Sequence, residues 1–190
     1  MILKIATIGH PVLRQIARRV EKAELLSDAT QRFIDDLVET MFDASGAGLA
    51  ANQVHNPIRI CAICVKDNPR YPYKPNYPLT VLVNPVLTPT SEETFLNYEG
   101  CLSVPNLRGE VPRVVSVRVQ AWDRAGKELD FEVKGLTAGT FQHEVDHLDG
   151  KVFLDRVEDT RSLATWNDFD RYHKEKFVER AKALVARFGS

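Results

Sequence analysis

The stretch QHEVDHLDG, Gln142 to Gly150, places two histidines four residues apart and an acid directly after the first. On an α-helix this spacing separates His143 from His147 by about 40° of rotation, so both imidazoles face the same point. Glu144 projects about 100° from His143, beside the imidazoles, where a general base for an attacking water would stand. Roughly the opposite side carries the apolar residues Phe141, Val145 and Leu148. The stretch therefore predicts a central helix that is held in the core and presents a metal site.

A catalytic metal takes three protein ligands, and the third ligand decides the class of enzyme. In one class it is a histidine in the pattern HExxHxxGxxH, where Gly150 fits but Phe153 replaces the histidine. In another class, that of a zinc endopeptidase, it is a downstream glutamate, for which Glu158 and Glu175 are the candidates. A thiolate is also a good ligand, and Cys101 lies upstream in YEGCLSVP, although a lone cysteine is commonly a core residue. Spacing alone does not decide between these candidates.

The composition is that of one ordinary globular domain. The chain has 190 residues, of which 44% are hydrophobic and 27% charged, and a net charge of -1. This balance gives no reason to expect DNA as a partner, and no apolar run approaches the length of a membrane span. Three cysteines without a secretory signal fit reduced thiols better than disulfides. We therefore expect a cytoplasmic protein that binds neither DNA nor a membrane.

Cys61 and Cys64 form the sequence CAIC, which has the spacing of a redox or zinc pair. The surrounding residues read as a strand, however, and on a strand positions i and i+3 point to opposite faces. We therefore expect both cysteines to be core residues that do not share a metal.

Around the central helix, the chain alternates helical and strand patterns. Asp28 and Gln31 suit a capping box at the start of the first long helix, and Pro11 suits the start of a short one. Residues 115–122 and 129–133 alternate apolar and polar side chains, as the two strands of a hairpin do. The expected elements are helices at about 11–18, 29–44 and 168–188, and strands at 58–65, 79–87, 115–122 and 129–133. This order predicts an α+β fold with mainly antiparallel sheets and a C-terminal helix.

The connection NPRYPYKPNYP, residues 68–78, has prolines at 69, 72, 75 and 78. A period of three suits a polyproline II helix that a partner protein would bind. A stiff surface loop is the commoner role of such a segment, and a lid over an active site is a third interpretation.

Three stretches together resemble peptide deformylases of the bacterial type. They are GAGLAANQ (Gly46 to Gln53), EGCLS (Glu99 to Ser103) and QHEVDHLDG (Gln142 to Gly150), in the order and at the separations familiar from that family. The likeness covers about residues 5–160. It implies a catalytic domain at 1–165 and a C-terminal helical extension of the same domain at 166–190.

The resemblance implies that Cys101, His143 and His147 bind the metal. In this family the metal is typically Fe²⁺, and Zn²⁺, Ni²⁺ or Co²⁺ can replace it. The implied reaction is hydrolysis of the formyl group from the formylmethionine of nascent polypeptides, with release of formate. Glu144 would be the general base, and the Gln53 side chain and the Leu102 backbone N–H would stabilise the oxyanion.

The resemblance also implies contacts with the substrate. Gly46 and Gly48 would let its backbone approach, although Gly46 also suits the end of the preceding helix. Arg113 is expected to bind substrate, and a buried ion pair with Glu99 that supports the metal loop is the alternative.

Two departures from the family pattern concern the pocket for the methionine side chain. Ala47 is smaller than the usual residue, and so is the segment Ala138-Gly139-Thr140 just ahead of the metal helix. The preference for the first side chain is therefore open.

The C-terminal helix has an apolar stripe and a basic face. Packing on the body of the protein is the default for such a helix. In some bacterial deformylases a C-terminal helix contacts the ribosome, and the basic face indicates the ribosome as a partner here. The basic residues are Arg171, Lys174, Lys176, Arg180 and Lys182.

Overall fold

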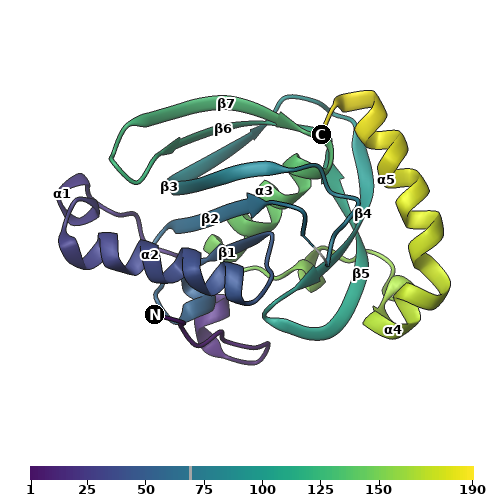
Figure 1. The fold of residues 1–190 in the computed structure, drawn as a ribbon, viewed down its shortest axis with the longest axis horizontal. Coiled ribbons are helices and arrows are strands. Elements are labelled where there is room, and N and C mark those ends of the chain that lie inside the picture. Colours follow the sequence, from purple (N-terminus) through teal and green to yellow (C-terminus); the bar gives the residue numbers. More distant parts are fainter. Residues whose placement is uncertain (69) are drawn as a thin grey trace.

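The computed structural model describes residues 1–68 and 70–190, which form two antiparallel sheets and a central helix (Figure 1). The five-stranded sheet has the order β1-β2-β3-β6-β7 and the three-stranded sheet the order β4-β5-β8. Every pairing between these strands is antiparallel, which confirms the predicted fold class. The strands are β1 (Gly48–Ala50), β2 (Ile60–Val65), β3 (Tyr77–Pro89), β4 (Thr94–Cys101), β5 (Val104–Val114), β6 (Ser116–Trp122), β7 (Glu128–Lys134) and β8 (Ala164–Thr165).

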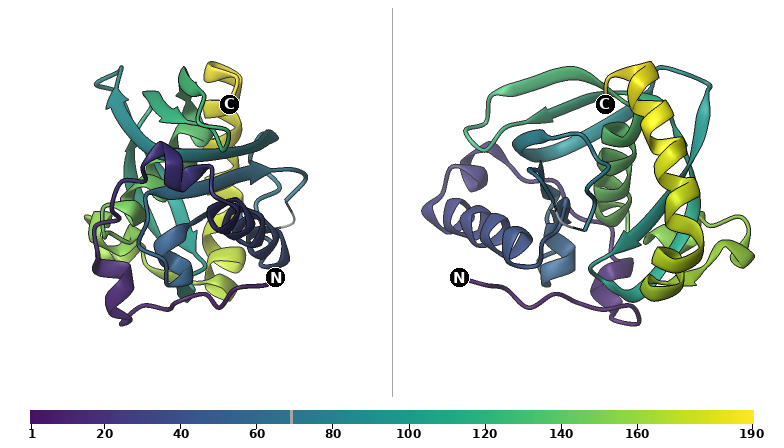
Figure 2. Two further views of the ribbon diagram at one scale, coloured as in Figure 1. Left: turned by 90° about the vertical axis from the view of Figure 1, so that its left-hand side faces the viewer. Right: turned by 45° about the vertical axis from the view of Figure 1, so that its right-hand side comes forward.

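Helix α3 (Gly135–Leu148) carries the histidine motif through the middle of the molecule (Figures 1 and 2). Phe141 and Leu148 have no exposed surface and Val145 is 7% exposed, so the predicted apolar side does lie in the core. The helix begins at Gly135, earlier than the motif itself. The segment Ala138-Gly139-Thr140 therefore lies inside the helix and not ahead of it, which corrects the expectation from sequence.

The hairpin of β6 and β7 matches its prediction. Val117 pairs with Val133 and Val119 with Phe131, and the turn is closed by a hydrogen bond from Asp123 N to Lys127 O of 2.8 Å. The valines of β6 face the core because a strand sends alternate side chains to opposite faces.

Helix α2 (Asp28–Asp43) starts one residue away from the predicted cap. The Ser27 Oγ accepts the hydrogen bond from Thr30 N, so Ser27 is the N-cap and Asp28 is the first helical residue. The predicted capping box is wrong because the Gln31 amide donates instead to Leu25 O and Arg124 O. A short helix, α1 (Lys22–Leu25), precedes it, and the predicted helix at 11–18 is only a four-residue 3-10 turn, Pro11–Arg14.

The C-terminal segment is helical from Trp166 onward. It comprises α4 (Trp166–Asp168), a π-helical turn (Phe169–His173) and α5 (Lys174–Phe188), which runs beside β4 and β5 (Figure 2, right). Its apolar stripe packs on Tyr98 and Leu136. The fully or nearly buried residues of that stripe are Phe169, Phe177 and Ala181, whereas Tyr172 is 64% exposed. Over the described residues, no helix combines the length and the apolar character needed to cross a membrane.

Candidate active site

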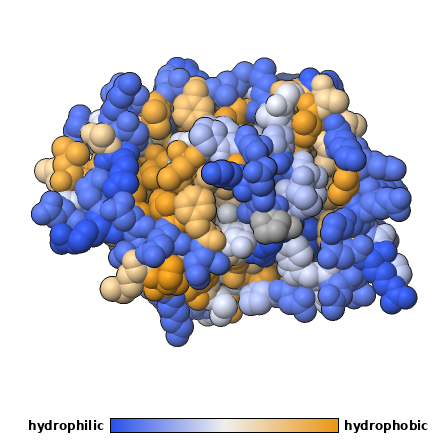
Figure 3. All heavy atoms as spheres, in the orientation of Figure 1, coloured by the Kyte–Doolittle hydropathy of each residue, from blue (hydrophilic) through white to orange (hydrophobic). Residues whose placement is uncertain are grey.

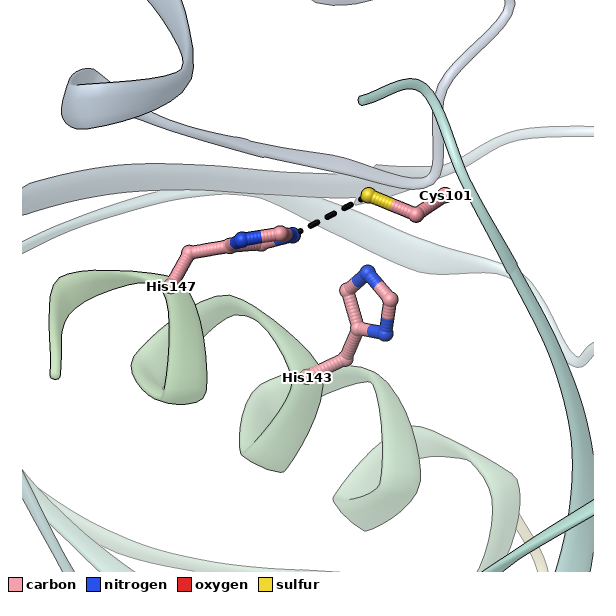
Figure 4. A group of neighbouring side chains, drawn as sticks. All are labelled: Cys101, His143 and His147. Atoms are coloured by element: carbon pink, nitrogen blue, oxygen red, sulfur yellow. Dashed lines mark hydrogen bonds between the residues drawn. The ribbon is translucent and has the colours of Figure 1, made fainter. Parts of the chain in front are cut away.

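The side chains of Cys101, His143 and His147 converge between the end of β4 and helix α3 (Figure 4). Cys101 ends strand β4, and the two histidines project from adjacent turns of α3 towards its sulfur. One ligand atom from each residue lies within 4.8 Å of the others, and Cys101 Sγ is 3.2 Å from His147 Nε2. In the described residues no other group of His, Cys, Asp and Glu side chains meets this standard. The alternatives Glu158 and Glu175 are exposed and lie outside the cluster.

An ion-pair network fixes the outer side of His143. Glu99 Oε2 lies 2.8 Å from His143 Nδ1, and Arg113 donates to both oxygens of Glu99 at 2.8 and 2.9 Å. Arg113 also donates to Asp146, which Arg156 holds from the other side. Because Nδ1 is engaged by a carboxylate, Nε2 is left for a metal. Burial opposes ionisation of Glu99, but Arg113 and His143 hold its pKa well below the ordinary value.

These contacts decide between the two interpretations of Arg113. Its side chain is 3% exposed and is occupied by Glu99 and Asp146. It does not line the cavity beside the cluster. The geometry therefore supports the buried ion pair with Glu99 and not the expected contact with substrate.

The surroundings of Cys101 favour its thiolate. Burial raises the pKa of the thiol, but the charges of His147 and His143 and their hydrogen bonds bring it well below its ordinary value. The sulfur also accepts hydrogen bonds from Ser103 N at 3.3 Å and from the Gln53 amide at 3.5 Å. A thiolate and two imidazoles suit a borderline metal such as Fe²⁺ or Zn²⁺, so the donor set fits the predicted ion.

A cavity opens beside the cluster, between β1, β4 and α3. Glu144 lies in its wall, 4% exposed, and its Oε2 has no hydrogen-bond partner among the described residues. Burial raises the pKa of Glu144. The cavity is lined by Gly46, Ala47, Gly48, Gln53, Tyr71, Lys74, Asn97, Tyr98, Glu99, Gly100, Cys101, Leu102, Gly139, Thr140, His143 and Glu144. The predicted base therefore lies with the predicted ligands in one accessible site.

The sequence model of the polypeptide deformylase family matches residues 2–162. The chain belongs to this family. A curated peptide deformylase of Nostoc sp. is 41% identical over 88% of this chain and 93% of its own length. One of Nitrosomonas europaea is 41% identical over 86% of this chain and 92% of its own.

Solved deformylase structures share the fold. The Met-Ala-Ser-bound class I type b peptide deformylase of Acinetobacter baumannii has a TM-score of 0.80 and 38% identity over 83% of this chain and 99% of its own. The actinonin complex of the Synechococcus elongatus enzyme has a TM-score of 0.74 and 30% identity over 98% of this chain and 86% of its own.

Gln53 and Leu102 both reach the deformylase cavity. Gln53 Oε1 accepts a hydrogen bond from Ala50 N at 2.8 Å, which turns the amide nitrogen towards Ser103 Oγ at 3.0 Å and the Cys101 sulfur. Because the acceptor side is held by the backbone, the donor side faces Cys101 and Ser103.

Gly46 and Gly48 have different roles. Gly46 N donates to Met41 O at 2.8 Å, but helix α2 ends at Asp43 and the left-handed residue after it is Ser45 (φ 51°), so Gly46 does not supply the helix-ending conformation that was expected of it. A Cβ on Gly48 would lie 2.4 Å from Glu144 Oε1. Gly48 is therefore required by the position of the base, a reason that the sequence did not reveal.

The segment after β2 borders the cavity. Tyr71 N donates to Asn68 O and Lys74 N to Tyr71 O, so the described part runs through successive turns and not as a polyproline helix. Tyr71 and Lys74 line the site, as the lid interpretation requires, and Pro69 lies outside the described residues. Sequence reasoning noted this segment but assigned no residue of it to the site.

The small residues at Ala47 and in the segment Ala138-Gly139-Thr140 have different surroundings in the structure. The space left by Gly139 is taken by neighbours, because a Cβ there would lie 3.2 Å from Asn97 Nδ2 and 3.3 Å from the Phe95 ring. Ala47 and Thr140 face the cavity, whereas Ala138 packs in the core.

Cys61 and Cys64 are buried on β2 and belong to different core clusters, as predicted.

Proposed function

We propose that this chain hydrolyses the formamide of N-formylmethionyl polypeptides and releases formate, with Fe²⁺ as the working metal. Membership of the deformylase family supports the reaction, and one observation supports its residues. The three donor atoms of Cys101, His143 and His147 share a cavity with the buried carboxyl of Glu144. This arrangement combines a metal site that has an open position with a general base.

Proton transfer and oxyanion stabilisation are assigned to different groups of the protein. Cys101, His143 and His147 would hold the metal, which would supply Lewis acidity towards the scissile carbonyl and the attacking water. Glu144 accepts the proton of the attacking water and passes it to the leaving amine. Charge that develops on the formyl oxygen is met by the Gln53 amide and the Leu102 N–H. Burial keeps these groups away from bulk water and strengthens their effect.

The backbone of the substrate is proposed to bind along β1. This strand is an edge of the five-stranded sheet, and its first residue, Gly48, borders the cavity together with Gly46 just before the strand. An extended peptide can add to such an edge through main-chain hydrogen bonds. That position would bring the formyl group beside Glu144.

Formate release from formyl-Met-Ala-Ser is the direct test. Protein prepared anaerobically with Fe²⁺ should release formate, and chelation should stop the release. Parallel preparations with Zn²⁺, Ni²⁺ and Co²⁺ rank the metals. Absence of formate from a fully metallated protein would reject the proposed function.

Gly48→Ala should lower formate release by about 100-fold. The new Cβ would overlap the Glu144 carboxyl and displace it by about 1 Å, and displacements of this size carry such costs. Metal content should be nearly unchanged, because the side chains of Cys101, His143 and His147 are not touched. Unchanged activity would show that Glu144 need not occupy this position.

The catalytic unit is proposed to span residues 1–165, with 166–190 as its helical extension. The family match to residues 2–162 supports this boundary. A cytoplasmic location is also proposed. It is supported by the three free, buried cysteines and by the nascent-chain substrate.

The basic face of the C-terminal helix is a proposed contact with ribosomal RNA. The outer side of this helix is hydrophilic (Figure 3, right), and Arg171, Lys176 and Lys182 are exposed. Its apolar side is occupied by the protein's own core, so a partner would meet the charged side.

Reversing charge on this face should weaken ribosome binding without affecting hydrolysis of a short peptide. Lys176→Glu with Lys182→Glu should lower the affinity by about tenfold at low salt. Deletion of the helix would expose Tyr98 and Leu136, on which its apolar stripe packs, so charge reversal is the cleaner change. The control is Lys4→Glu with Lys127→Glu, at exposed sites elsewhere. Equal co-sedimentation of both variants with ribosomes would reject this contact.

A further inference from the structure

Arg108 is a buried cation on strand β5 that no acid neutralises. Its side chain is 1% exposed, and within the described part of the chain it forms no ion pair with a carboxylate. One guanidinium nitrogen donates to the Tyr73 hydroxyl at 2.8 Å and to the Tyr98 carbonyl at 2.6 Å, whereas Nε has no partner among the described residues. Burying a charge without a counter-ion is costly, so other contacts must hold this guanidinium.

Aromatic rings surround the guanidinium where an acid would be expected. Its central carbon lies 3.9 Å from the centre of the Phe169 ring and 4.6 Å from that of Trp166. The rings of Tyr71 and Tyr98 both lie 5.7 Å away. A guanidinium is attracted to the faces of aromatic rings, and the attraction is stronger away from water. Arg108 therefore connects strand β4, the loop after β2 and the C-terminal segment.

The loop after β2 rests on the C-terminal segment. The Tyr71 ring lies 6.2 Å from that of Trp166, and the Tyr73 ring lies 5.1 Å from that of Phe177. Trp166 and Phe177 both follow the residues that the family model matches, which end at 162. The position of this loop thus depends on a part of the chain outside the matched region.

Tyr71 is the residue of this loop that forms the cavity wall beside the proposed substrate backbone. It is 7% exposed and shares one buried cluster with Ala47 and Val65. Tyr71 and Ala47 both line the cavity, and Ala47 lies between Gly46 and Gly48, where the backbone of the substrate is proposed to bind. The Tyr71 ring therefore adds apolar surface next to a position where this chain has only a methyl group.

We propose that Arg108 is a positioning residue for deformylation, which acts through its contacts with Tyr71 and Trp166 to hold the Tyr71 ring as the cavity wall beside the substrate. This inference rests on the proposed function and deepens it, because it identifies what completes the substrate cavity. The C-terminal segment then contributes to substrate binding as well as to the proposed contact with the ribosome.

The first test is the split between KM and kcat in Arg108→Met. Methionine removes the charge and the planar group that stacks on the rings, so the Tyr71 wall should loosen. KM for formyl-Met-Ala-Ser should rise by about tenfold, which is the contribution of a desolvated contact of this kind. The value of kcat and the metal content should stay within about twofold, because no hydrogen bond of Arg108 reaches the metal ligands or Glu144.

A double-mutant cycle shows whether Arg108 acts through Tyr71. Tyr71→Ala should itself raise KM, and Arg108→Met should then add little in that background. Tyr73→Phe removes one acceptor of the Arg108 hydrogen bonds and keeps the ring, so it tests the same contact even where Arg108→Met does not fold. It should raise KM by about threefold. Arg118→Met, on the exposed hairpin, is the control and should behave as the wild type.

The outcomes separate this inference from the proposed function. An unchanged KM in Arg108→Met and Tyr73→Phe, additive effects of Arg108→Met and Tyr71→Ala, or a fall in kcat without a rise in KM would each overturn the inference and leave the function intact. Calorimetry with the product Met-Ala-Ser needs no turnover. A wild type that releases no formate, but binds this peptide about tenfold more tightly than Arg108→Met, would reject the proposed function and support the role of Arg108.

Discussion

Replacing Glu144 by glutamine is expected to lower formate release by about 10²–10⁴-fold, the usual contribution of a general acid–base group. The amide has nearly the shape of the carboxyl but cannot accept the proton of water. Glu144 is 4% exposed, lies beside the ligands and has an oxygen without a partner among the described residues, so a proton acceptor is the role that its surroundings leave open.

Metal content separates this role from a structural one. Glu144→Gln should bind a full equivalent of metal, because Cys101, His143 and His147 are unchanged. Glu158→Gln is the matched control at an exposed glutamate, and it should keep full activity. Wild-type turnover in Glu144→Gln would contradict the assignment of the base. Loss of metal in that variant would show that the carboxyl supports the site and does not act on the proton.

Periodicity predicted α2, β6, β7 and the C-terminal helix, but it missed β4 and β5, although both are among the longer strands. The alternation in residues 116–122 indicated a strand with one buried face, and the apolar side of α3 indicated the side that packs in the core. Ends of elements were predicted less well, because caps depend on single hydrogen bonds. Ser27 caps α2 because its hydroxyl accepts the hydrogen bond from Thr30 N. The Gln31 amide donates instead to the carbonyls of Leu25 and Arg124, and residue 124 is remote in sequence.

The candidate metal ligands were predicted from sequence in two steps. The spacing of His143 and His147 is a local property of a helix, so residues alone predicted the pair. Cys101 approaches from strand β4, which is remote from the helix in sequence, and spacing alone could not decide between Cys101 and Glu158. The resemblance to deformylases supplied that choice, and the cluster of donor atoms agrees with it.

The residues that sequence reasoning missed reach the site through tertiary contacts. Lys74 meets Thr140 across 66 positions of sequence, and Asn97 fills the space left by Gly139. The small residue at 139 was visible in the sequence, but the side chain that occupies its space was not. Asp146 was visible as the second acid of the motif, yet its role depends on Arg113 and Arg156.

Replacing Cys101 by serine is expected to remove the metal and, with it, the activity. A neutral hydroxyl is a much poorer ligand than a thiolate for a borderline metal. The affinity for the metal should fall by more than about 100-fold. That is the largest loss usually caused by replacing residues that only hydrogen-bond to the ligands, and Cys101 is itself a proposed ligand. Metal per chain after dialysis, read by elemental analysis, should drop from about one to near zero.

Cys64→Ser provides the matched control, since Cys64 is also a buried free cysteine but lies outside the cluster. It should keep its metal. Retention of metal in Cys101→Ser would instead favour the endopeptidase type of site, in which Glu158 or Glu175 is the third ligand. The exposed positions of both glutamates make that result unexpected, because either would have to move inward to meet the histidines. The contacts of the sulfur lead to the same conclusion. Ser103 N and the Gln53 amide both donate to Cys101, so the site is already arranged around a negatively charged sulfur.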